Sequence, residues 1–259
     1  MISFNPVKKA LSERRVTLGG WIQIGHPAVA EIFSQAGFDW IAVDCEHADM
    51  SLADFSNIAR GMNGTGAVPF ARVRENDTLA IRQILDAGAR GVIVPLVNTA
   101  EEAVKAVVAS NFPPEGVRGF AFCRANNWGA DFDEYAKTAN HETVVIIMVE
   151  SKQAVENIDE ILEVRGVDGV FIGPYDMSGS YGVVGQTNHD SVREACATVL
   201  EACKRHGKAA GIHIVDPAKE VIEKAISDGF TFIALGMDTV FISGASREAL
   251  RAARTGGDQ

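Results

Sequence analysis

Eight apolar, β-rich runs alternate with stretches of helical spacing along almost the whole chain, which restricts the folds it can adopt. The runs are TLGGWIQI (17–24), DWIAVD (39–44), AVPFARV (67–73), GVIVPLV (91–97), VVIIMVE (144–150), GVFIGP (169–174), AAGIHIV (209–215) and TFIALG (231–236). Nearly continuous apolar strands indicate burial on both faces, and the intervening helices indicate parallel pairing through crossovers. The pattern predicts a closed (β/α)8 barrel, the TIM-barrel architecture, ahead of an open doubly wound sheet.

Length and turn residues favour a single domain. The chain has 259 residues, which suits one barrel. Glycine precedes several of the apolar runs, as in QAGFDW and SDGFTF, where it is typical of a helix end. We therefore expect residues 1–259 to form one (β/α)8 domain. The segment 113–143 breaks the alternation, and an insertion of this size is often a functional loop.

Charge and cysteine content exclude several classes of protein. A net charge of −10 leaves no broad basic surface, so no nucleic-acid binding is expected. No apolar stretch approaches the roughly 20 residues that span a bilayer, so we expect no membrane role and a cytoplasmic protein. The four cysteines show no C-x-x-C spacing, which predicts reduced thiols rather than a zinc site or disulfides.

Polar residues gather where the apolar runs end, which is where barrel enzymes place their reacting groups. These residues are Asp44, Glu46, His47, Arg72, Arg74, Glu150, Asp176 and His213. The set contains carboxylates, arginines and histidines, with no hydroxyl or thiol plainly paired to a base. It predicts metal-assisted acid/base chemistry.

Two carboxylates lie one strand–helix unit apart, Glu150 after VVIIMV and Asp176 in GPYD. Adjacent parallel strands would bring them together, and two hard oxygen ligands are typical of a Mg2+ or Mn2+ site. Alternatively, Glu150 caps the helix that begins SKQAV, and Asp176 serves the next turn. The glycine and free N–H groups of GPYD could also bind a substrate carboxylate.

His47 and Asp44 follow the same strand, so Asp44 could orient the imidazole as a general base or acid. The alternative for His47 is a structural role in a loop. Arg72 ends the next strand, where its guanidinium suits a carboxylate or a developing enolate oxygen, and Arg74 competes for that role.

Two further charged residues have open roles. Glu46 is expected to serve packing or a salt bridge. Arg124 lies in the long loop beside Trp128, where it could bind a second anionic group or remain a surface arginine.

The motifs GGWIQIG, AGFDWIAVDCEHA, ARVREND, VRGF, CRANNW, VRGVDGVFIGPYDMS and GMDT occur in an order and spacing that resemble the HpcH/HpaI aldolase family. That family comprises metal-dependent class II pyruvate aldolases, such as 4-hydroxy-2-oxoheptanedioate and 2-keto-3-deoxy-sugar-acid aldolases. The resemblance runs from about Leu18 to the final helix. It implies a (β/α)8 barrel and a carbon–carbon lyase that reversibly cleaves a 4-hydroxy-2-oxo acid into pyruvate and an aldehyde through a metal-stabilised enolate.

The resemblance also implies roles for individual residues. A divalent ion (Mg2+, Mn2+ or Co2+) is held by Glu150 and Asp176, Arg72 contacts the keto oxygen, and His47 with Asp44 forms an acid/base dyad. The substrate-binding positions it implies are Trp21, Arg72, Arg124, Met148, Gly173, Tyr175, Asp176 and His213, with the backbone amides of Tyr175 and Asp176 on the carboxylate. Many members carry Gln where this chain has Met148, which puts substrate orientation or acceptor preference in question.

Assembly follows from the same resemblance. It implies a homo-oligomer, a hexamer built as a trimer of dimers or a smaller assembly, in which the C-terminal helix packs on a neighbour and Asp86 reaches the adjacent site. Two other functions are considered: a CoA-ester lyase of the citrate lyase or malyl-CoA lyase type, and a non-catalytic keto-acid-binding barrel. The CoA-ester lyase is disfavoured because no strip of basic residues indicates binding of a long phosphorylated carrier. The non-catalytic barrel is disfavoured because a protein that had lost its activity would be expected to lose the polar residues of its rim first.

Overall fold

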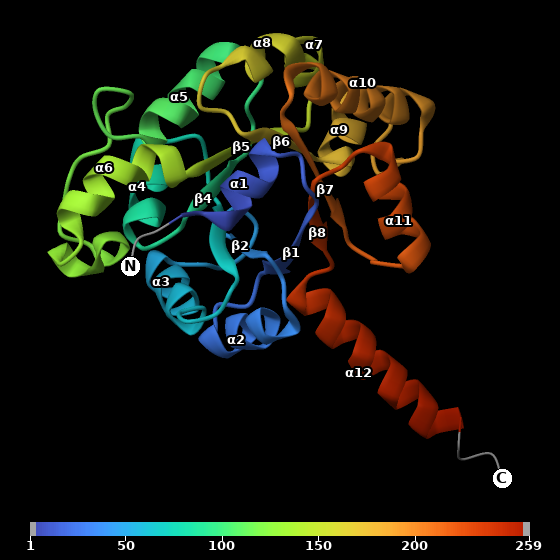
Figure 1. Cartoon of the computed structure of the whole chain (residues 1–259). Helices are drawn as coiled ribbons and strands as arrows, with labels where there is room; N and C mark the ends of the chain where they lie inside the picture. The colour runs from blue at the N-terminus through green and yellow to red at the C-terminus, as the bar shows by residue number, and fades with distance from the viewer. Residues whose placement is uncertain (1–3, 256–259) are drawn as a thin grey trace.

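Eight parallel strands close into a barrel in chain order in the computed structural model, which describes residues 4–255 (Figure 1). The strands are β1 Thr17–Ile22, β2 Trp40–Asp44, β3 Val68–Arg72, β4 Gly91–Val94, β5 Val144–Val149, β6 Gly169–Ile172, β7 Ala209–Ile214 and β8 Phe232–Leu235. Each strand pairs with the next, and β8 pairs with β1. The (β/α)8 barrel predicted from the sequence is confirmed.

Helices cover the outside of the barrel and one of its ends (Figure 1). They are α1 Pro6–Ser12, α2 Pro27–Ala36, α3 Leu52–Gly61, α4 Thr78–Asp86, α5 Ala100–Ser110, the 3-10 helix η1 Arg124–Gly129, α6 Phe132–Glu142, α7 Lys152–Glu156, α8 Ile158–Glu163, α9 Pro174–Ser180, α10 Asp190–His206, α11 Lys219–Asp228 and α12 Asp238–Thr255. The predicted insertion between β4 and β5 contains η1 and α6.

Large aromatic rings opposite glycines fill the barrel interior. Trp40 of β2 stacks on Phe232 of β8 with ring centroids 3.9 Å apart. A Cβ on Gly19 would lie 2.2 Å from the Trp40 ring, and one on Gly91 would lie 2.1 Å from the Phe70 ring. Only glycine leaves room for these rings, so the centre is a packed core rather than a pore.

Helix α1 closes the N-terminal end of the barrel. Val7 and Leu11 join the hydrophobic cluster of the barrel interior. Lys8 Nζ donates to the Thr143 carbonyl at 2.6 Å and to the Asp168 carboxylate at 3.0 Å, both just before strands. In (β/α)8 enzymes the substrate site lies at the opposite end, where the strands finish.

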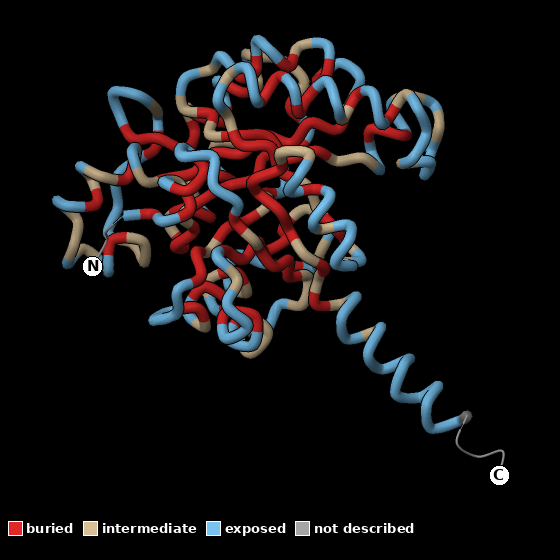
Figure 2. Tube along the Cα trace, turned by 45° about the vertical axis from the view of Figure 1, so that its right-hand side comes forward, coloured by how far each residue is buried: buried red, intermediate tan, exposed pale blue. Residues whose placement is uncertain are grey.

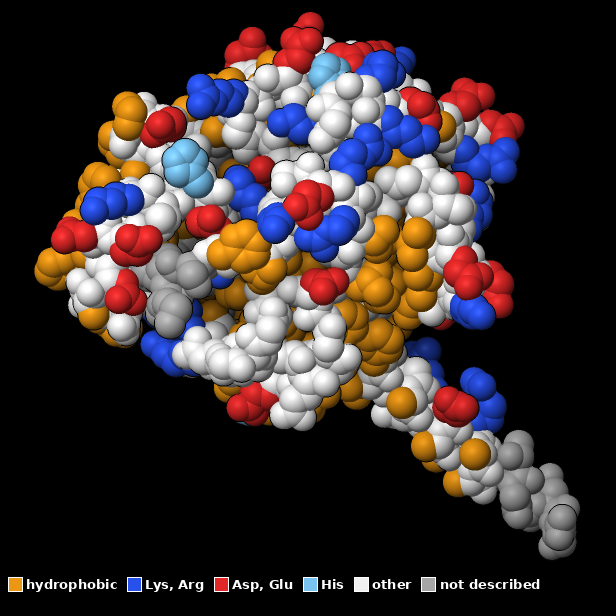
Figure 3. All heavy atoms as spheres, in the orientation of Figure 1, with side chains coloured by type: hydrophobic (Ala, Val, Ile, Leu, Met, Phe, Trp, Pro, Cys, Tyr) orange, Lys and Arg blue, Asp and Glu red, His pale blue; other side chains and the backbone are white. Residues whose placement is uncertain are grey.

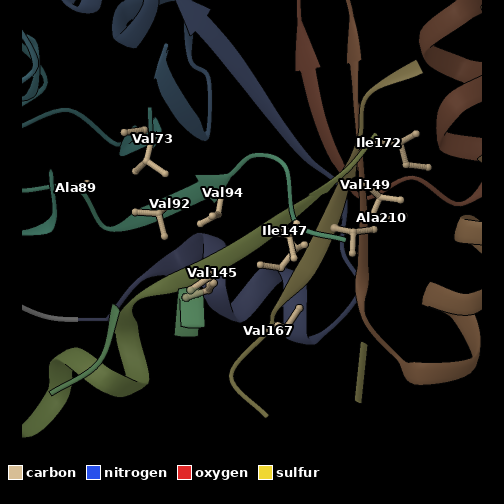
Figure 4. Packing of buried hydrophobic residues seen from close by; sticks show 14 of the residues in the cluster. Val73, Ala89, Val92, Val94, Val145, Ile147, Val149, Val167, Ile172 and Ala210 are labelled. Carbon is tan, nitrogen blue, oxygen red and sulfur yellow. The ribbon is translucent and has the colours of Figure 1, made fainter. Parts of the chain in front are cut away.

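The second hydrophobic layer lies between the strands and the surrounding helices. Residues that alternate with the interior positions point outward, including Val92, Val145, Ile147 and Val149 (Figure 4). Strands buried on both faces explain the nearly continuous apolar runs in the sequence. Figure 2 shows the resulting contrast between the buried barrel and the exposed outer helix faces.

Helix α12 differs from the others because it projects away from the barrel (Figures 1 and 2). Its exposed side chains include Ile242 and Leu250, which are 54% and 52% accessible, and hydrophobic side chains are visible along it in Figure 3. Among the described residues of a single chain, this apolar surface of α12 is left uncovered. Within residues 4–255, none of the helices has both the length and the apolar character needed to cross a membrane.

Candidate active site

The polar residues at the C-terminal rim continue the inward-facing rows of the strands. Side chains alternate between the two faces of a strand, so Asp44 follows the interior residue Ala42, and Arg72 follows the interior residue Phe70. Strand register pairs Asp44 directly with Arg72. The same alternation places Glu150 two residues after the interior Met148.

Asp44 and Arg72 form a buried two-pronged ion pair. Arg72 Nε donates to Asp44 Oδ1 at 3.0 Å, and Arg72 Nη2 donates to Oδ2 at 2.6 Å. Burial opposes ionisation of Asp44, but the bonds and charge of Arg72, helped by the Gln23 amide and the His47 N–H, lower its pKa to about 2. The pair therefore fixes a permanent guanidinium at the rim.

The expected link between Asp44 and the His47 ring is absent. Asp44 Oδ1 accepts the backbone N–H of His47 at 3.1 Å, while the imidazole is 61% exposed and its Nε2 lies 3.8 Å from Glu46 Oε2. The Asp44 oxygens instead accept from Arg72, from the Gln23 amide and from backbone N–H groups, and the acid/base dyad stays a prediction. His47 remains at the rim with a solvent-exposed ring.

Glu46 lies beside Arg72 in the candidate active site. From the sequence, we expected only packing or a salt bridge for this residue. Its Oε2 lies 3.2 Å from Arg72 Nη1, which confirms the salt bridge, but this buried atom accepts no hydrogen bond from the described residues. Burial raises its pKa, against the nearby Arg72 charge, and Asp176 also acts to raise it. The missed signal was its spacing, because Glu46 follows Asp44 by two residues.

Glu150 is buried at the end of β5, with 6% of its surface exposed. Its Oε1 accepts the Leu96 N–H at 2.7 Å, and Leu96 adopts a left-handed backbone with φ of 56° to present that N–H. Burial raises the Glu150 pKa, opposed by the Leu96 bond, and the negative charges of Glu46 and Asp176 raise it further. The contact of Leu96 with Glu150 could not be predicted from the sequence, because it is made by the backbone N–H and not by the side chain.

Asp176 lies in the first turn of α9, which follows β6 directly. The turn approaches Glu150 closely because residue 173 is glycine. A Cβ on Gly173 would lie 3.0 Å from Glu150 Cβ, 3.2 Å from its Oε2 and 3.7 Å from Met148 Cε. The charge of Asp176 also acts to raise the Glu150 pKa, and a joint role of the two carboxylates as metal ligands stays a prediction.

These carboxylates suit a hard divalent cation. Glu46, Glu150 and Asp176 repel one another, and a buried Glu46 oxygen lacks a hydrogen-bond donor. In residues 4–255 no group of three or more His, Cys, Asp or Glu side chains is arranged to hold a metal. Glu150 and Asp176 would therefore need water or substrate oxygens to complete the coordination.

An aromatic and apolar wall lies beside the charged residues. Trp21 stacks on His213 with centroids 5.1 Å apart, and the Arg72 guanidinium lies 5.2 Å from the Trp21 ring centroid. His213 Nε2 faces the Gly236 carbonyl at 2.8 Å, so this nitrogen carries a proton. Burial lowers the His213 pKa, which favours the neutral ring. Met148 is buried below the Glu150 carboxylate.

Comparison with known proteins agrees with this geometry. The family model for "HpcH/HpaI aldolase/citrate lyase" matches residues 17–245. This chain belongs to the HpcH/HpaI family. A hydroxypyruvate/pyruvate aldolase from Roseobacter denitrificans is 40% identical over 92% of this chain and 93% of its own length. A 5-keto-4-deoxy-D-glucarate aldolase from Citrobacter koseri is 35% identical over 90% of each.

Solved structures show the same HpcH/HpaI fold. A family protein from Burkholderia cenocepacia J2315 superimposes with a TM-score of 0.92 at 33% identity, over 96% of this chain and 99% of that one. A citrate lyase beta subunit from M. tuberculosis reaches a TM-score of 0.60 at 15% identity, over 89% and 95%. The second likeness shows only a shared fold, so the CoA-ester lyase alternative gains no support from it.

Arg124 lies outside the candidate active site of its own chain. It donates to the Ala87 carbonyl at 3.0 Å, the Ala59 carbonyl at 2.8 Å and Asn63 Oδ1 at 2.9 Å. The carbonyls lie at the C-terminal ends of α3 and α4, where a cation is favoured, at the end of the barrel away from the rim. Arg124 therefore lies away from the rim of its own chain, and its role in binding substrate stays a prediction.

Two other charged residues are held by partners outside the candidate active site. Asp86 ends α4 and accepts the Arg118 guanidinium at 2.7 Å, so its predicted role in a neighbouring site stays a prediction. Arg74, the competitor of Arg72, donates to the Met50 carbonyl at 2.6 Å and braces the loop after β2. Arg72 is the arginine that reaches the candidate site.

Proposed function

We propose that this HpcH/HpaI protein is a metal-dependent class II aldolase that reversibly cleaves a 4-hydroxy-2-oxo acid into pyruvate and an aldehyde. One observation carries the proposal. The Asp44–Arg72 pair presents a fixed guanidinium at the same rim as the mutually repelling carboxylates Glu46, Glu150 and Asp176. A 2-oxo acid needs both a cation for its keto oxygen and a site for a chelated ion.

Glu150 and Asp176 would hold the ion, for which we propose Mg2+, Mn2+ or Co2+. When bound, a divalent ion supplies Lewis-acid polarisation of the keto group. The first N–H groups of α9, at Tyr175 and Asp176, have no acceptor within the helix and point to a carboxylate-binding role. They would fix the acid end of the substrate beside the keto group.

Carbon–carbon cleavage then moves charge toward Arg72. The bond between C3 and C4 breaks, its electron pair passes to the C2 oxygen, and the product is the enolate of pyruvate. The guanidinium stabilises that oxygen through N–H groups that Asp44 leaves free. We assign removal of the C4 hydroxyl proton to His47, whose exposed ring follows β2 at the rim and lies 3.8 Å from Glu46 Oε2. Protonation of C3 completes pyruvate.

The aromatic and apolar wall strengthens this charge stabilisation. Trp21, Phe171 and Met148 are buried beneath the rim, so they limit the water around the reacting oxygen. The neutral His213 ring adds no cation that would compete with Arg72 for the enolate. Met148 offers substrate no hydrogen bond comparable to that of an amide.

Exchange of the pyruvate methyl protons with D2O tests enolisation without knowledge of the aldehyde. We expect NMR-detected exchange that stops with EDTA and returns with Mg2+, Mn2+ or Co2+. Glu150→Ala should abolish exchange and metal binding, whereas Glu156→Ala, on the exposed surface of α7, should retain both. Full exchange in the metal-free protein, or in Glu150→Ala, would show that the proposed mechanism is wrong.

A further inference from the structure

Gln23 stands beside Asp44 at the rim, although it was not among the residues expected there from the sequence. It follows Trp21 by two residues, so it occupies the next inward-facing position after β1. The register that pairs Trp21 with Ala42 brings Gln23 level with Asp44. Its Nε2 donates to Asp44 Oδ2 at 3.0 Å.

Both ends of the Gln23 amide have hydrogen-bond partners, and the Asp44 carboxylate sets its orientation. Thr239, in the first turn of α12, donates its hydroxyl to Gln23 Oε1 at 3.3 Å. A flipped amide would place an oxygen against the Asp44 carboxylate, which can only accept. The two partners therefore allow one orientation, with the nitrogen on Asp44 and the oxygen on Thr239.

The backbone of Gln23 is held by a second residue of α12. The buried Asp238 carboxylate accepts the Gln23 N–H at 3.0 and 3.1 Å and the Ile24 N–H at 2.8 Å. Asp238 also accepts the Thr239 N–H at 2.8 Å. The start of α12 thus fixes both the backbone and the side chain of Gln23.

Gln23 completes the set of donors that holds the Asp44 carboxylate in the plane of the Arg72 guanidinium. Asp44 Oδ1 receives Arg72 Nε and the N–H groups of Glu46 and His47, while Oδ2 receives Arg72 Nη2 and Gln23 Nε2. Without Gln23, Oδ2 keeps only the arginine bond, so the orientation of the carboxylate is less tightly held. A rotated Asp44 would no longer match both prongs of Arg72.

We propose that Gln23 is a positioning residue, which aligns the Asp44–Arg72 pair with the developing enolate oxygen and links this pair to the start of α12. This role rests on the aldolase function proposed above. Gln23 adds no charge, so it can orient the pair without changing the net charge of the site. We expect Gln23 to stabilise the transition state more than the bound substrate, because the substrate oxygen gains negative charge only in the transition state.

Replacement with a nonpolar side chain of similar length tests the role directly. Gln23→Leu should lower kcat for pyruvate methyl exchange roughly 10-fold, the scale of one hydrogen bond to a charged group, with KM within about twofold. Thr239→Val should lower kcat by less, since Gln23 keeps its bond to Asp44. Gln35→Ala, an exposed glutamine of α2, serves as the matched control and should match the wild type.

A second variant separates positioning from folding. Gln23→Glu places a new carboxyl among the charged groups Asp44, Arg72 and Asp238. Its protonated form can still donate to Asp44, whereas its ionised form repels it. We expect kcat relative to wild type to fall as pH rises through the titration of the new carboxyl, with the folded fraction checked by circular dichroism at each pH.

The possible outcomes distinguish failure of the positioning role of Gln23 from failure of the proposed aldolase function. Absence of methyl exchange in the wild type, with every metal, overturns the aldolase function itself. An active wild type together with unchanged kcat in folded Gln23→Leu overturns the positioning role. If Gln23→Leu does not fold, a flat ratio of Gln23→Glu to wild-type kcat across pH overturns it instead.

Discussion

Asp44 remains ionised inside the barrel because five N–H groups point at its two oxygens. Three of these donors come from neighbouring strand ends, two from Arg72 and one from Gln23. A buried carboxylate is costly unless it is paired and bonded in this way. Two directed hydrogen bonds, in addition to the opposite charge, therefore fix the position of the Arg72 guanidinium. A fixed position is needed to recognise one particular substrate oxygen.

The lowered pKa of Asp44 gives its ion pair a defined dependence on pH. The folded-state pKa is about 2, below the ordinary value of 3.8. Its contribution to the free energy of unfolding is therefore complete above about pH 4 and is lost as pH falls toward about 2. We expect Asp44→Asn to cost about 2 kcal/mol at neutral pH, with the difference from wild type shrinking across that acid window.

Urea unfolding followed by circular dichroism, between about pH 7 and about pH 2.5, measures this dependence. Asp49 is an exposed residue of the loop after β2 and provides the control. Asp49→Asn should leave the free energy of unfolding near the wild-type value at every pH. A constant gap between wild type and Asp44→Asn down to the lowest pH would show that the ion pair does not set the pKa.

Residues that continue a strand pattern could be predicted, and those that depend on loop conformation could not. Asp44, Arg72 and Glu150 follow apolar strands, so simple alternation and the barrel topology place them at the rim. The His47 ring and Arg124 belong to loops, where the sequence does not fix the direction of a side chain. Gln23 follows the interior Trp21 by two residues, and Glu46 follows Asp44 by two. Counting in steps of two from the interior residues of each strand would have found both.

At the scale of elements, the turn from β6 to α9 sets the distance between the two carboxylates proposed to hold the ion. Gly173→Ala would place a Cβ 3.0 Å from Glu150 Cβ, so Glu150 must move. We expect the affinity for Mn2+, measured by isothermal titration calorimetry, to fall about tenfold, the scale typical of disturbed neighbours of a metal ligand.

Gly179→Ala provides the matched comparison within α9. Nothing lies within 4 Å of a Cβ at Gly179, and alanine is the better helix former. This variant should bind Mn2+ as the wild type does and unfold at an equal or slightly higher temperature. Equal metal affinity in Gly173→Ala and Gly179→Ala would show that the turn does not control Glu150.

At the scale of the whole molecule, we propose that α12 packs on a second copy of the chain. The barrel is covered by its own helices, whereas α12 carries the exposed apolar residues Ile242 and Leu250 beyond it. Ile242→Asp and Leu250→Asp should each weaken self-association at least about tenfold, because a charge would enter an apolar contact. Size-exclusion chromatography with light scattering measures the change. Val221→Asp, an exposed apolar site on α11, should keep the wild-type mass.

We also propose that Asp86 contributes to the active site of a neighbouring chain. In its own chain, Asp86 lies at the end of the barrel opposite the rim. Arg118 is fully buried and pairs with Asp86, whose side chain is 26% exposed. The pair leaves part of a fixed carboxylate at the surface, available to a neighbour. Asp86→Asn is the suitable variant, because an amide oxygen can still accept from Arg118 and a buried arginine without a partner is strongly destabilising.

Mixing two inactive chains tests whether Asp86 completes an adjacent site. One chain carries Asp86→Asn and the other carries Glu150→Ala, and each alone should be inactive in pyruvate methyl exchange. After denaturation and refolding of an equal mixture, random assembly should give about a quarter of the wild-type activity, since only sites with an intact Glu150 and a neighbour with an intact Asp86 can work. Separately refolded chains, mixed afterwards without subunit exchange, should stay inactive. Assembled mixtures that remain inactive would place the role of Asp86 within its own chain.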